Sequence, residues 1–375
     1  MMVRKYLTEI IPRRGVMKNN FLGAKSVAIL LVIMALSCGV APAQTFQVGP
    51  LQVPPGQKQS GYLAVPSGPD GDTQIPVTVI NGATRGPALA VIAGNHGYEY
   101  PPILAAQRLA SSIDPQKLKG RIVIVHVANL PSFLKRTIYY SPIDGKNLNR
   151  VYPGKVDGTI SERIAYVITK EVIDRTDYLV DLHCGDGNES LRPYSYWNPI
   201  GNAKVDEPAK QMAEVFGLNN IVIDRSRPAD PKESKYCSNT AMTRGKPALS
   251  IESGGMGVAS DEGEIVAIER GVQNLMRYLK MADGRPETPA QITWYDPAEV
   301  LYFPADSPNK SGLFFPKVQK TQMVDKGALL GVVTDYFGKQ IYELRAPFAG
   351  EVLYIIATPP ISAGEPLAFI GAIKK

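Results

Sequence analysis

Apolar residues recur with two different spacings between residues 75 and 283. Short runs rich in Val, Ile and Leu predict β-strands, and longer stretches with helical spacing between them predict helices. The predicted strands are residues 77–80, 88–94, 121–129, 178–183, 221–224 and 248–252, and the predicted helices are residues 103–112, 161–175 and 262–281. Strands that are apolar throughout and alternate with helices are typical of an α/β fold whose sheet is covered on both faces.

The pattern changes around residues 283–289, where Gly284, Pro286 and Pro289 predict a linker. No helical spacing follows, so residues 290–375 are predicted to form a smaller β-rich C-terminal domain. This domain contains a faint repeat, because residues 324–330 and 361–367 each carry a turn glycine, a leucine three residues later and then an apolar run. The repeat resembles the two halves of a sandwiched barrel of the lipoyl/biotinyl type. Residues 335–338 lack the lysine placement of a carrier hairpin, so we expect a structural or lid module.

The first 43 residues have the composition of an export signal. A basic region ends at Lys25, an apolar run follows at 27–36, and the small residues 41–43 offer a cleavage site. That run is shorter than the roughly 20 residues that span a bilayer as a helix, so we expect no membrane span after cleavage. The prediction is a periplasmic or otherwise exported protein with an N-terminal extension at 44–74. A lipid anchor on Cys38 is a minor alternative.

The charge balance bears on nucleic acid binding, and the number of cysteines bears on disulfide bonds. Residues 1–43 hold six basic side chains and one acidic one, so 35 basic and 34 acidic side chains remain in the rest of the chain. A nearly neutral body gives no electrostatic reason to expect a nucleic acid partner. Only Cys184 and Cys237 remain after cleavage, enough for one disulfide but not for a disulfide framework. The composition leaves oligomerisation open.

Three side chains with metal-binding chemistry follow predicted strands. His96 and Glu99 form an H-x-x-E pair directly after residues 88–94, and His183 ends the strand 178–183. Ligand sites of open α/β sheets lie at the carboxyl ends of strands, so these residues are expected to meet. Two imidazoles and one carboxylate leave one position of a tetrahedral zinc ion open, as catalytic zinc sites do.

Two further groups complete a hydrolytic site. Glu252 ends an apolar strand before Ser253-Gly254-Gly255, and it is a candidate general base because a zinc hydrolase needs a carboxylate that is not a ligand. The alternative is an ordinary solvated glutamate at a strand end. Asn149 and Arg150 lie in a loop rich in Pro and Gly, where an arginine fork can pair with a substrate carboxylate or form a structural ion pair.

The ordered set His96-x-x-Glu99, Asn149-Arg150, Asp181-x-His183 and Glu252 resembles the succinylglutamate desuccinylase/aspartoacylase family of zinc carboxypeptidase-like hydrolases. The resemblance covers roughly residues 75–375. It implies a mixed sheet flanked by helices at 75–283 with a β-rich C-terminal domain. It also implies that His96, Glu99 and His183 bind one zinc ion per chain, that Glu252 is the general base and acid, and that Asn149 and Arg150 hold a substrate carboxylate.

The sequence departs from the family pattern in two places. Members carry an arginine about seven residues before the Asn-Arg pair, thought to polarise the scissile carbonyl, where this chain has Pro142. Arg136 and Arg192 are the candidates to replace it. The usual aspartate before Leu-Asn-Arg is Asn147 here.

Three other polar or thiol-bearing residues have alternative interpretations. Asp181 either orients His183 from behind or hydrogen-bonds a backbone group. His126, within the predicted strand 121–129, is expected to be a satisfied core histidine. Cys184 follows His183 directly and is expected to point to the opposite face of the strand.

The sequence therefore predicts an exported zinc hydrolase that cleaves an amide bond of a small N-acyl amino acid or related carboxylate. A zinc carboxypeptidase acting on peptides or cell-wall stem peptides shares this chemistry, as does an ester hydrolase. A non-catalytic metal- or ligand-binding protein of the envelope is the alternative from another class, against which Glu252 argues.

Overall fold

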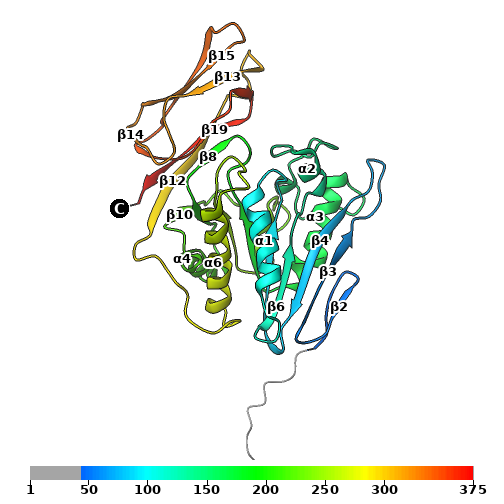
Figure 1. The fold of residues 1–375 in the computed structure, drawn as a ribbon. Coiled ribbons are helices and arrows are strands. Elements are labelled where there is room, and N and C mark those ends of the chain that lie inside the picture. The colour runs from blue at the N-terminus through cyan, green and yellow to red at the C-terminus, as the bar shows by residue number, and fades with distance from the viewer. Residues whose placement is uncertain (1–43, 375) are drawn as a thin grey trace, which may run out of the picture. The chain divides into compact units, whose positions relative to one another are not determined.

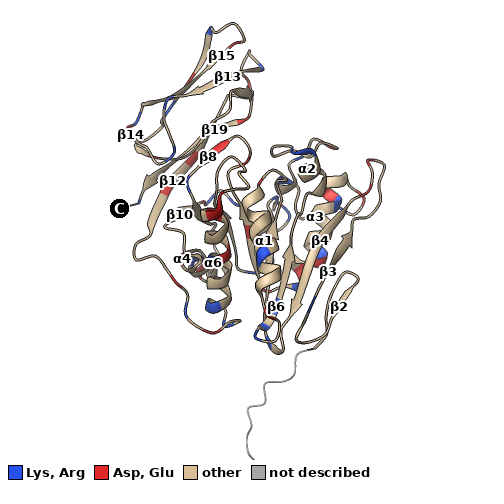
Figure 2. Cartoon of the chain, in the orientation of Figure 1, with Lys and Arg blue, Asp and Glu red and all other residues tan. Residues whose placement is uncertain are grey.

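The computed structural model describes residues 44–374. The predicted export signal, with Cys38, lies outside the described residues. Within residues 44–374, no helix is both long and apolar enough to cross a membrane. Lys and Arg are interspersed with Asp and Glu along this part of the chain (Figure 2).

A large mixed sheet forms the centre of the fold (Figure 1). Its strands run in the order β9, β11, β7, β5, β6, β4 and β3 from the middle to one edge. Their bounds are β3 Gln57–Ala64, β4 Gln74–Asn81, β5 Thr84–Ala93, β6 Lys119–Val125, β7 Tyr178–His183, β9 Tyr194–Trp197 and β11 Ala248–Glu252. Strands β6, β5, β7 and β11 are parallel, so their carboxyl ends meet at one edge of the sheet. A small hairpin of β1 (Phe46–Val48) and β2 (Leu51–Val53) packs against the core formed on one face.

Helices cover both faces of this sheet. The helices are α1 Tyr100–Ser112, α2 Leu130–Lys135, α3 Ile160–Glu171, α4 Ala203–Phe216, α5 Cys237–Met242 and α6 Glu262–Tyr278, with short 3-10 turns η1 Leu148–Arg150 and η2 Ile173–Arg175. Successive residues of β5 point into two different cores, because side chains alternate along a strand. Ala90 and Ile92 pack with α3, whereas Leu89 and Val91 pack with α1 and α6, which lie side by side (Figure 1). The predicted α/β fold with a doubly covered sheet is confirmed.

Most predicted elements of this region are present, with differences at their ends. Helix α1 begins three residues earlier than predicted, because Pro101 and Pro102 occupy its first turn, where the missing N–H groups cost no hydrogen bond. Thr159 is the N-cap of α3 in a capping box with Glu162, and the helix ends at Glu171 rather than at Arg175. Helix α4 was not predicted from the sequence, and it carries Pro208 in its interior.

The C-terminal region is antiparallel and all-β, as predicted. Its strands are β12 Thr293–Tyr302, β13 Ser311–Pro316, β14 Met323–Val324, β15 Leu329–Thr334, β16 Gln340–Arg345, β17 Gly350–Ile356, β18 Pro360–Ser362 and β19 Pro366–Ile373. Strand β12 pairs in parallel with β10 (Asn220–Ile223), so β12, β19, β17 and β14 continue the large sheet. Strand β8 (Glu189–Leu191) also pairs with β17, which links the loop after β7 to this region.

The two copies of the sequence repeat adopt the same local structure. Gly327 and Gly364 have φ of 84° and 89°, a region that glycine occupies without the steric penalty of a side chain. The leucines that follow, Leu330 and Leu367, are fully buried. Each glycine therefore turns the chain into a strand of the C-terminal core, β15 in the first copy and β19 in the second.

Candidate active site

Three predicted metal ligands meet where β5 and β7 end. His96 and Glu99 lie in the loop between β5 and α1, and His183 is the last residue of the neighbouring parallel strand β7. The Nδ1 atoms of His96 and His183 lie 2.7 Å and 2.8 Å from the two carboxylate oxygens of Glu99. One donor atom from each of the three residues lies within 4.8 Å of the others, so the group can hold a metal ion.

The loop that carries His96 and Glu99 packs tightly on the start of α2. A Cβ atom at Gly97 would lie 2.1 Å from the backbone nitrogen of Phe133, which no side chain can adopt. Glycine at this position therefore allows the H-x-x-E turn to lie directly against the backbone of α2. Any larger residue would push the two ligands away from His183.

The remaining nitrogen of each imidazole faces a hydrogen-bond acceptor. His96 Nε2 lies 3.1 Å from Asn147 Oδ1, and His183 Nε2 lies 3.1 Å from Asp181 Oδ2. Each imidazole can therefore donate Nε2–H to its acceptor, which leaves the Nδ1 lone pair free for a metal. Partners of this kind fix the tautomer and the ring orientation of metal-binding histidines.

Asp181 is held by buried side chains rather than by the backbone. Asn95 donates from Nδ2 to Asp181 Oδ1 at 2.6 Å, and Tyr152 donates to Asn95 Oδ1 at 2.8 Å. These three residues are almost completely buried. Of the two sequence interpretations of Asp181, the geometry therefore supports the orientation of His183. It also supplies a continuous path of hydrogen bonds from Tyr152 to that ligand.

The charges within the cluster are strongly coupled. Burial opposes protonation of His183, but Asp181 and Glu99 on its two sides outweigh burial and raise its pKa well above the ordinary value. Burial raises the pKa of Glu99, and the two histidines outweigh it and lower that pKa to about 2. Two imidazole nitrogens and one ionised carboxylate form a donor set that suits zinc, whose binding displaces any proton on Nδ1.

Glu252 lies beside His183 at the end of the adjacent strand. Strands β11 and β7 are parallel, and Glu252 is paired in register with His183. Neighbouring residues in register point to the same face of a sheet, about 4.8 Å apart. Burial raises the pKa of the Glu252 carboxyl well above its ordinary value, opposed by His183 and reinforced by Glu99 and Glu189. A carboxyl beside the ligands that is not one of them fits a base with a raised pKa.

The glycines after Glu252 allow two loops to lie close together. A Cβ atom at Gly255 would lie 3.3 Å from the backbone nitrogen of Leu191. Met256 donates its backbone N–H to Glu189 at 2.8 Å, and Gly185 donates to Gly254 at 2.8 Å. The loop after β11 is therefore joined to the segment that carries β8.

A cavity of about 530 Å³ contains this site. Its wall combines residues from the central sheet with residues from the C-terminal strands. It is lined by His96, Glu99, Tyr139, Tyr140, Asn147, Arg150, Glu189, Leu191, Tyr194, Tyr196, Val222, Asp224, Ser226, Arg227, Tyr236, Glu252, Ala298, Glu299, Val300, Tyr302, Tyr354, Gly364, Pro366 and Phe369. This volume suits a small molecule rather than an extended peptide.

Arg150 and Asn149 take different places at this site. Arg150 is exposed and lines the cavity, with its guanidinium carbon 4.6 Å from the ring centre of Tyr236. Asn149 is buried and does not line the cavity. Its Oδ1 accepts from Cys237 N at 2.8 Å, and its Nδ2 lies 3.1 Å from His183 Nε2. Asn149 therefore lies behind the three predicted metal ligands and outside the cavity wall.

Neither arginine suggested as a replacement for the family's carbonyl-polarising residue lines the cavity. Arg192 forms an ion pair with Glu351, and Arg136 is an exposed residue that ends α2. Arg227 does line the cavity, with its guanidinium carbon 3.5 Å from the ring centre of Tyr236 and its Nε 2.7 Å from Asp224. Arg227 was missed because it lies three residues beyond the predicted strand 221–224, in a loop without a motif.

Glu189 and Tyr139 were also missed. Tyr139 donates its hydroxyl to Glu189 Oε1 at 2.8 Å, and its ring stands edge-on to His96 with the ring centres 6.0 Å apart. Tyr139 has φ of 57°, a conformation that costs energy in a residue with a side chain and that often marks functional sites. Its backbone N–H donates to Asp186 Oδ2 at 3.0 Å, which helps to hold this conformation.

The structure also tests what the sequence predicted for Cys184, Cys237 and His126. Cys184 and Cys237 are buried free thiols, so the structure contains no disulfide between them. His126 lies just beyond the end of β6 and is half-buried. Its Nε2 lies 2.8 Å from Thr78 Oγ1, but its Nδ1 is buried without a partner. The expectation of a satisfied core histidine is therefore wrong in part.

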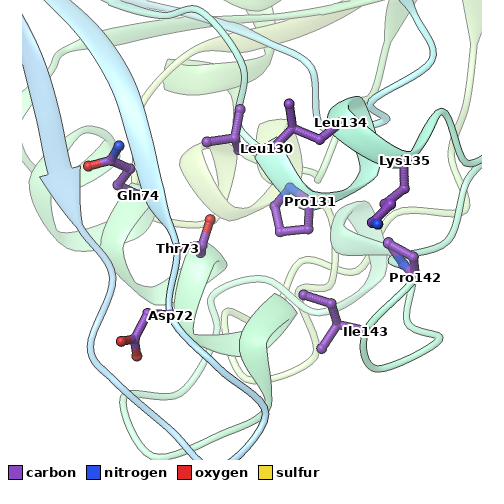
Figure 3. A pocket seen from close by; sticks show the side chains of 9 residues that line it. All are labelled: Asp72, Thr73, Gln74, Leu130, Pro131, Leu134, Lys135, Pro142 and Ile143. Atoms are coloured by element: carbon purple, nitrogen blue, oxygen red, sulfur yellow. The ribbon is translucent and has the colours of Figure 1, made fainter.

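A second cavity, of about 580 Å³, lies elsewhere on the protein (Figure 3). It is lined by Asp72, Thr73, Gln74, Leu130, Pro131, Leu134, Lys135, Pro142 and Ile143. None of the cluster residues contributes to it, and its wall is mostly apolar.

Comparisons with known proteins agree with this geometry. Residues 85–279 match the family model of the succinylglutamate desuccinylase/aspartoacylase catalytic domain. The chain is 32% identical over 244 residues to the N-alpha-acetyl-L-2,4-diaminobutyric acid deacetylase of Halomonas elongata, a match that covers 63% of this chain and 68% of that protein.

Solved structures share the fold. A succinylglutamate desuccinylase from Silicibacter sp. TM1040 superposes with a TM-score of 0.73 at 24% identity, over 88% of this chain and all of that one. The product-bound ectoine utilization protein EutE (DoeB) from Ruegeria pomeroyi gives 0.73 at 26% identity, over 85% and 97%. Deacetylases and desuccinylases are deacylating hydrolases, and this chain is accordingly a hydrolase with an AstE/AspA fold. It belongs to the succinylglutamate desuccinylase/aspartoacylase family.

Proposed function

We propose that this protein is a zinc-dependent amidohydrolase that removes the acyl group from a small N-acyl amino acid. The observation that carries the proposal is one cavity lined by His96, Glu99, the separate carboxyl Glu252 and the cation Arg150, with His183 beside it to complete the donor set. The deacetylase and desuccinylase names of the relatives support it. The N-terminal sequence supports export to the periplasm, which we propose as the compartment.

The side chains divide the reaction between them. His96, Glu99 and His183 would hold zinc, which when bound supplies Lewis acidity toward water and toward the scissile carbonyl. Glu252 accepts a proton from the attacking water and later delivers it to the leaving amine. Burial raises the pKa of Glu252 well above its ordinary value, which makes it a stronger base than an exposed carboxylate. Arg150 holds the carboxylate of the substrate through charge-assisted hydrogen bonds.

Replacement of Glu252 by glutamine tests this division. Glu252→Gln keeps the size of the side chain and removes the base, so kcat for N-acyl amino acids should fall by about 10²–10⁴-fold. Zinc content should stay at one ion per chain, because Glu252 is not a ligand in the proposal. Turnover would be followed as release of free amino acid from a panel of acetylated and succinylated amino acids.

The outcomes distinguish the alternatives. Loss of zinc from Glu252→Gln would show that Glu252 is a ligand and not a base. A metal-replete wild-type protein that hydrolyses esters or short peptides, but no N-acyl amino acid, would replace the proposal with an esterase or carboxypeptidase. A preparation that binds no zinc after metal supplementation would refute the proposal.

A further inference from the structure

Glu189 is a buried carboxyl in the wall of the active-site cavity with no cation beside it. Its Oε1 accepts from the Tyr139 hydroxyl at 2.8 Å, and its Oε2 accepts from the backbone N–H of Asp186 at 3.0 Å. Both donors are neutral. Among the ion pairs of residues 44–374, none includes Glu189. Buried charges are normally paired, so this carboxyl has the environment of a group whose partner arrives from outside.

The electrostatics at Glu189 favour a positive charge. Burial raises the pKa of Glu189 to about 7, which the hydrogen bond from Tyr139 opposes and the charge of Asp186 reinforces. A carboxyl with such a pKa lacks a compensating cation. An ammonium group placed beside it would favour the ionised form and gain a charge-assisted hydrogen bond.

Aromatic rings stand around the same part of the cavity. Tyr139 and Tyr354 both line it, and the charge of Glu189 contributes to the raised pKa of each phenol. The ring of Tyr354 lies 5.7 Å from that of Phe369, and Phe369 lies 5.9 Å from Tyr194. The faces of aromatic rings attract cations, so their presence beside a carboxylate strengthens the preference for an ammonium group.

The positively charged side chains that line the cavity lie around Tyr236 and not around Glu189. Arg150 and Arg227 both contact the ring of Tyr236, and Arg227 is paired with Asp224. Arg150 forms no ion pair with a described carboxylate, so its charge is available for the carboxylate of the substrate. The cavity therefore offers one site for an anion and another for a cation.

We propose that Glu189, with Tyr139 and Tyr354 beside it, binds a free ammonium group of the substrate. The substrate class is then an N-acyl amino acid that carries a second, unacylated amino group, with its carboxylate on Arg150. This inference rests on the proposed deacylase function and specifies its substrate.

The proposal is tested by comparing kcat/KM for pairs of substrates of equal length, of which only one carries an ammonium group. Nα-acetyldiaminobutyrate and Nα-acetylnorvaline differ by an ammonium group in place of a methyl group, as do Nα-acetylornithine and Nα-acetylnorleucine. For the zinc-loaded full chain, kcat/KM should be at least about tenfold higher for the ammonium-bearing member of at least one pair, as expected for a charged hydrogen bond. This comparison needs no variant, so it does not depend on how substitutions affect folding.

A pair of variants assigns the preference to Glu189. Glu189→Gln should reduce the preference to about twofold or less, through a lower kcat/KM for the ammonium-bearing member, and zinc content serves as the check on folding. Glu299→Gln, which removes an exposed carboxyl from the same cavity, should keep the preference. Equal rates within both pairs, or a preference that survives in Glu189→Gln, would overturn this inference alone. Failure to hydrolyse any N-acyl amino acid would overturn the proposed function, and this inference with it.

Discussion

The two ends of the active-site cavity differ in how their polar groups are partnered. At the metal end, each ring nitrogen of His96 and His183 and both oxygens of Glu99 contact another group of the protein. At the substrate end, Arg150 and Glu189 have no partner of opposite charge among the described residues. A cofactor that stays in place needs ligands oriented in advance, whereas a substrate that comes and goes must find groups free to receive it.

Asn149 and Arg150 show this difference within two consecutive residues. Asn149 is buried against His183 and receives a hydrogen bond from Cys237, whereas Arg150 is exposed in the cavity. The 3-10 turn η1 (Leu148–Arg150) makes this division possible, because neighbouring side chains on such a turn point in different directions. One short turn therefore places Asn149 against His183 at the proposed metal end and Arg150 in the cavity at the proposed substrate end.

The largest effect should follow removal of a ligand from the metal end. His183→Ala is expected to lose the bound zinc and to abolish hydrolysis of every substrate, because two donors cannot retain the ion against solvent. Metal analysis of the purified variant and a rate assay would measure both. His126→Ala is the matched control, since His126 lies outside the donor set and should keep zinc and activity. A His183→Ala protein with full zinc and full activity would refute the ligand assignment.

Effects of intermediate size are expected at Arg150 and Asn149, on KM at the first and on zinc affinity at the second. Arg150→Ala should raise KM by about ten- to a hundredfold through loss of a charge-assisted hydrogen bond, with zinc affinity unchanged. Asn149→Ala should instead weaken zinc binding by about tenfold or more, as loss of a group behind a ligand does, with a smaller effect on KM in the zinc-saturated enzyme. Competition with a zinc chelator and steady-state kinetics would measure the two quantities. The reverse pattern would show that Asn149 contacts the substrate.

The smallest effect is expected at Arg227. Its charge is already paired with Asp224, so Arg227→Ala should change KM by only about two- to fivefold, the range of one weak cation–π contact. Steady-state kinetics beside Arg150→Ala would rank the two arginines. A rise in KM as large as that expected for Arg150→Ala would show that Arg227 contacts the substrate directly.

The metal end was predictable from the sequence because it is built on strands. Runs of Val, Ile and Leu locate the strands, and His183 and Glu252 are their last residues, so the meeting of the carboxyl ends follows from the parallel order. The family resemblance indicated the same residues. The burial of Asn149 could not be predicted, since its sequence position beside Arg150 says nothing about the direction of its side chain.

The substrate end was not predictable for a physical reason. Glu189, Tyr139 and Arg227 reach the cavity through turns, through pairing of β8 with β17, and through a left-handed residue, none of which has a periodic sequence signal. Tyr354 and Phe369 come from strands of the C-terminal region that are distant in sequence. Helix α4 was missed at the level of the fold because Pro208 interrupts an otherwise amphipathic pattern.

The in-register pairing of β7 and β11 has a consequence for how this protein can change during evolution. The backbone ladder from Ala248–Leu179 to Glu252–His183 fixes the position of the proposed base, Glu252, relative to a proposed metal ligand, His183, whatever the length of the chain between the two strands. Insertions or deletions in the connections between residues 184 and 247 can therefore remodel the recognition of substrates without moving the reacting groups. A single-residue slip within the ladder would turn Glu252 to the opposite face of the sheet. Natural variation in length should accordingly accumulate in those connections and be absent from the two strands.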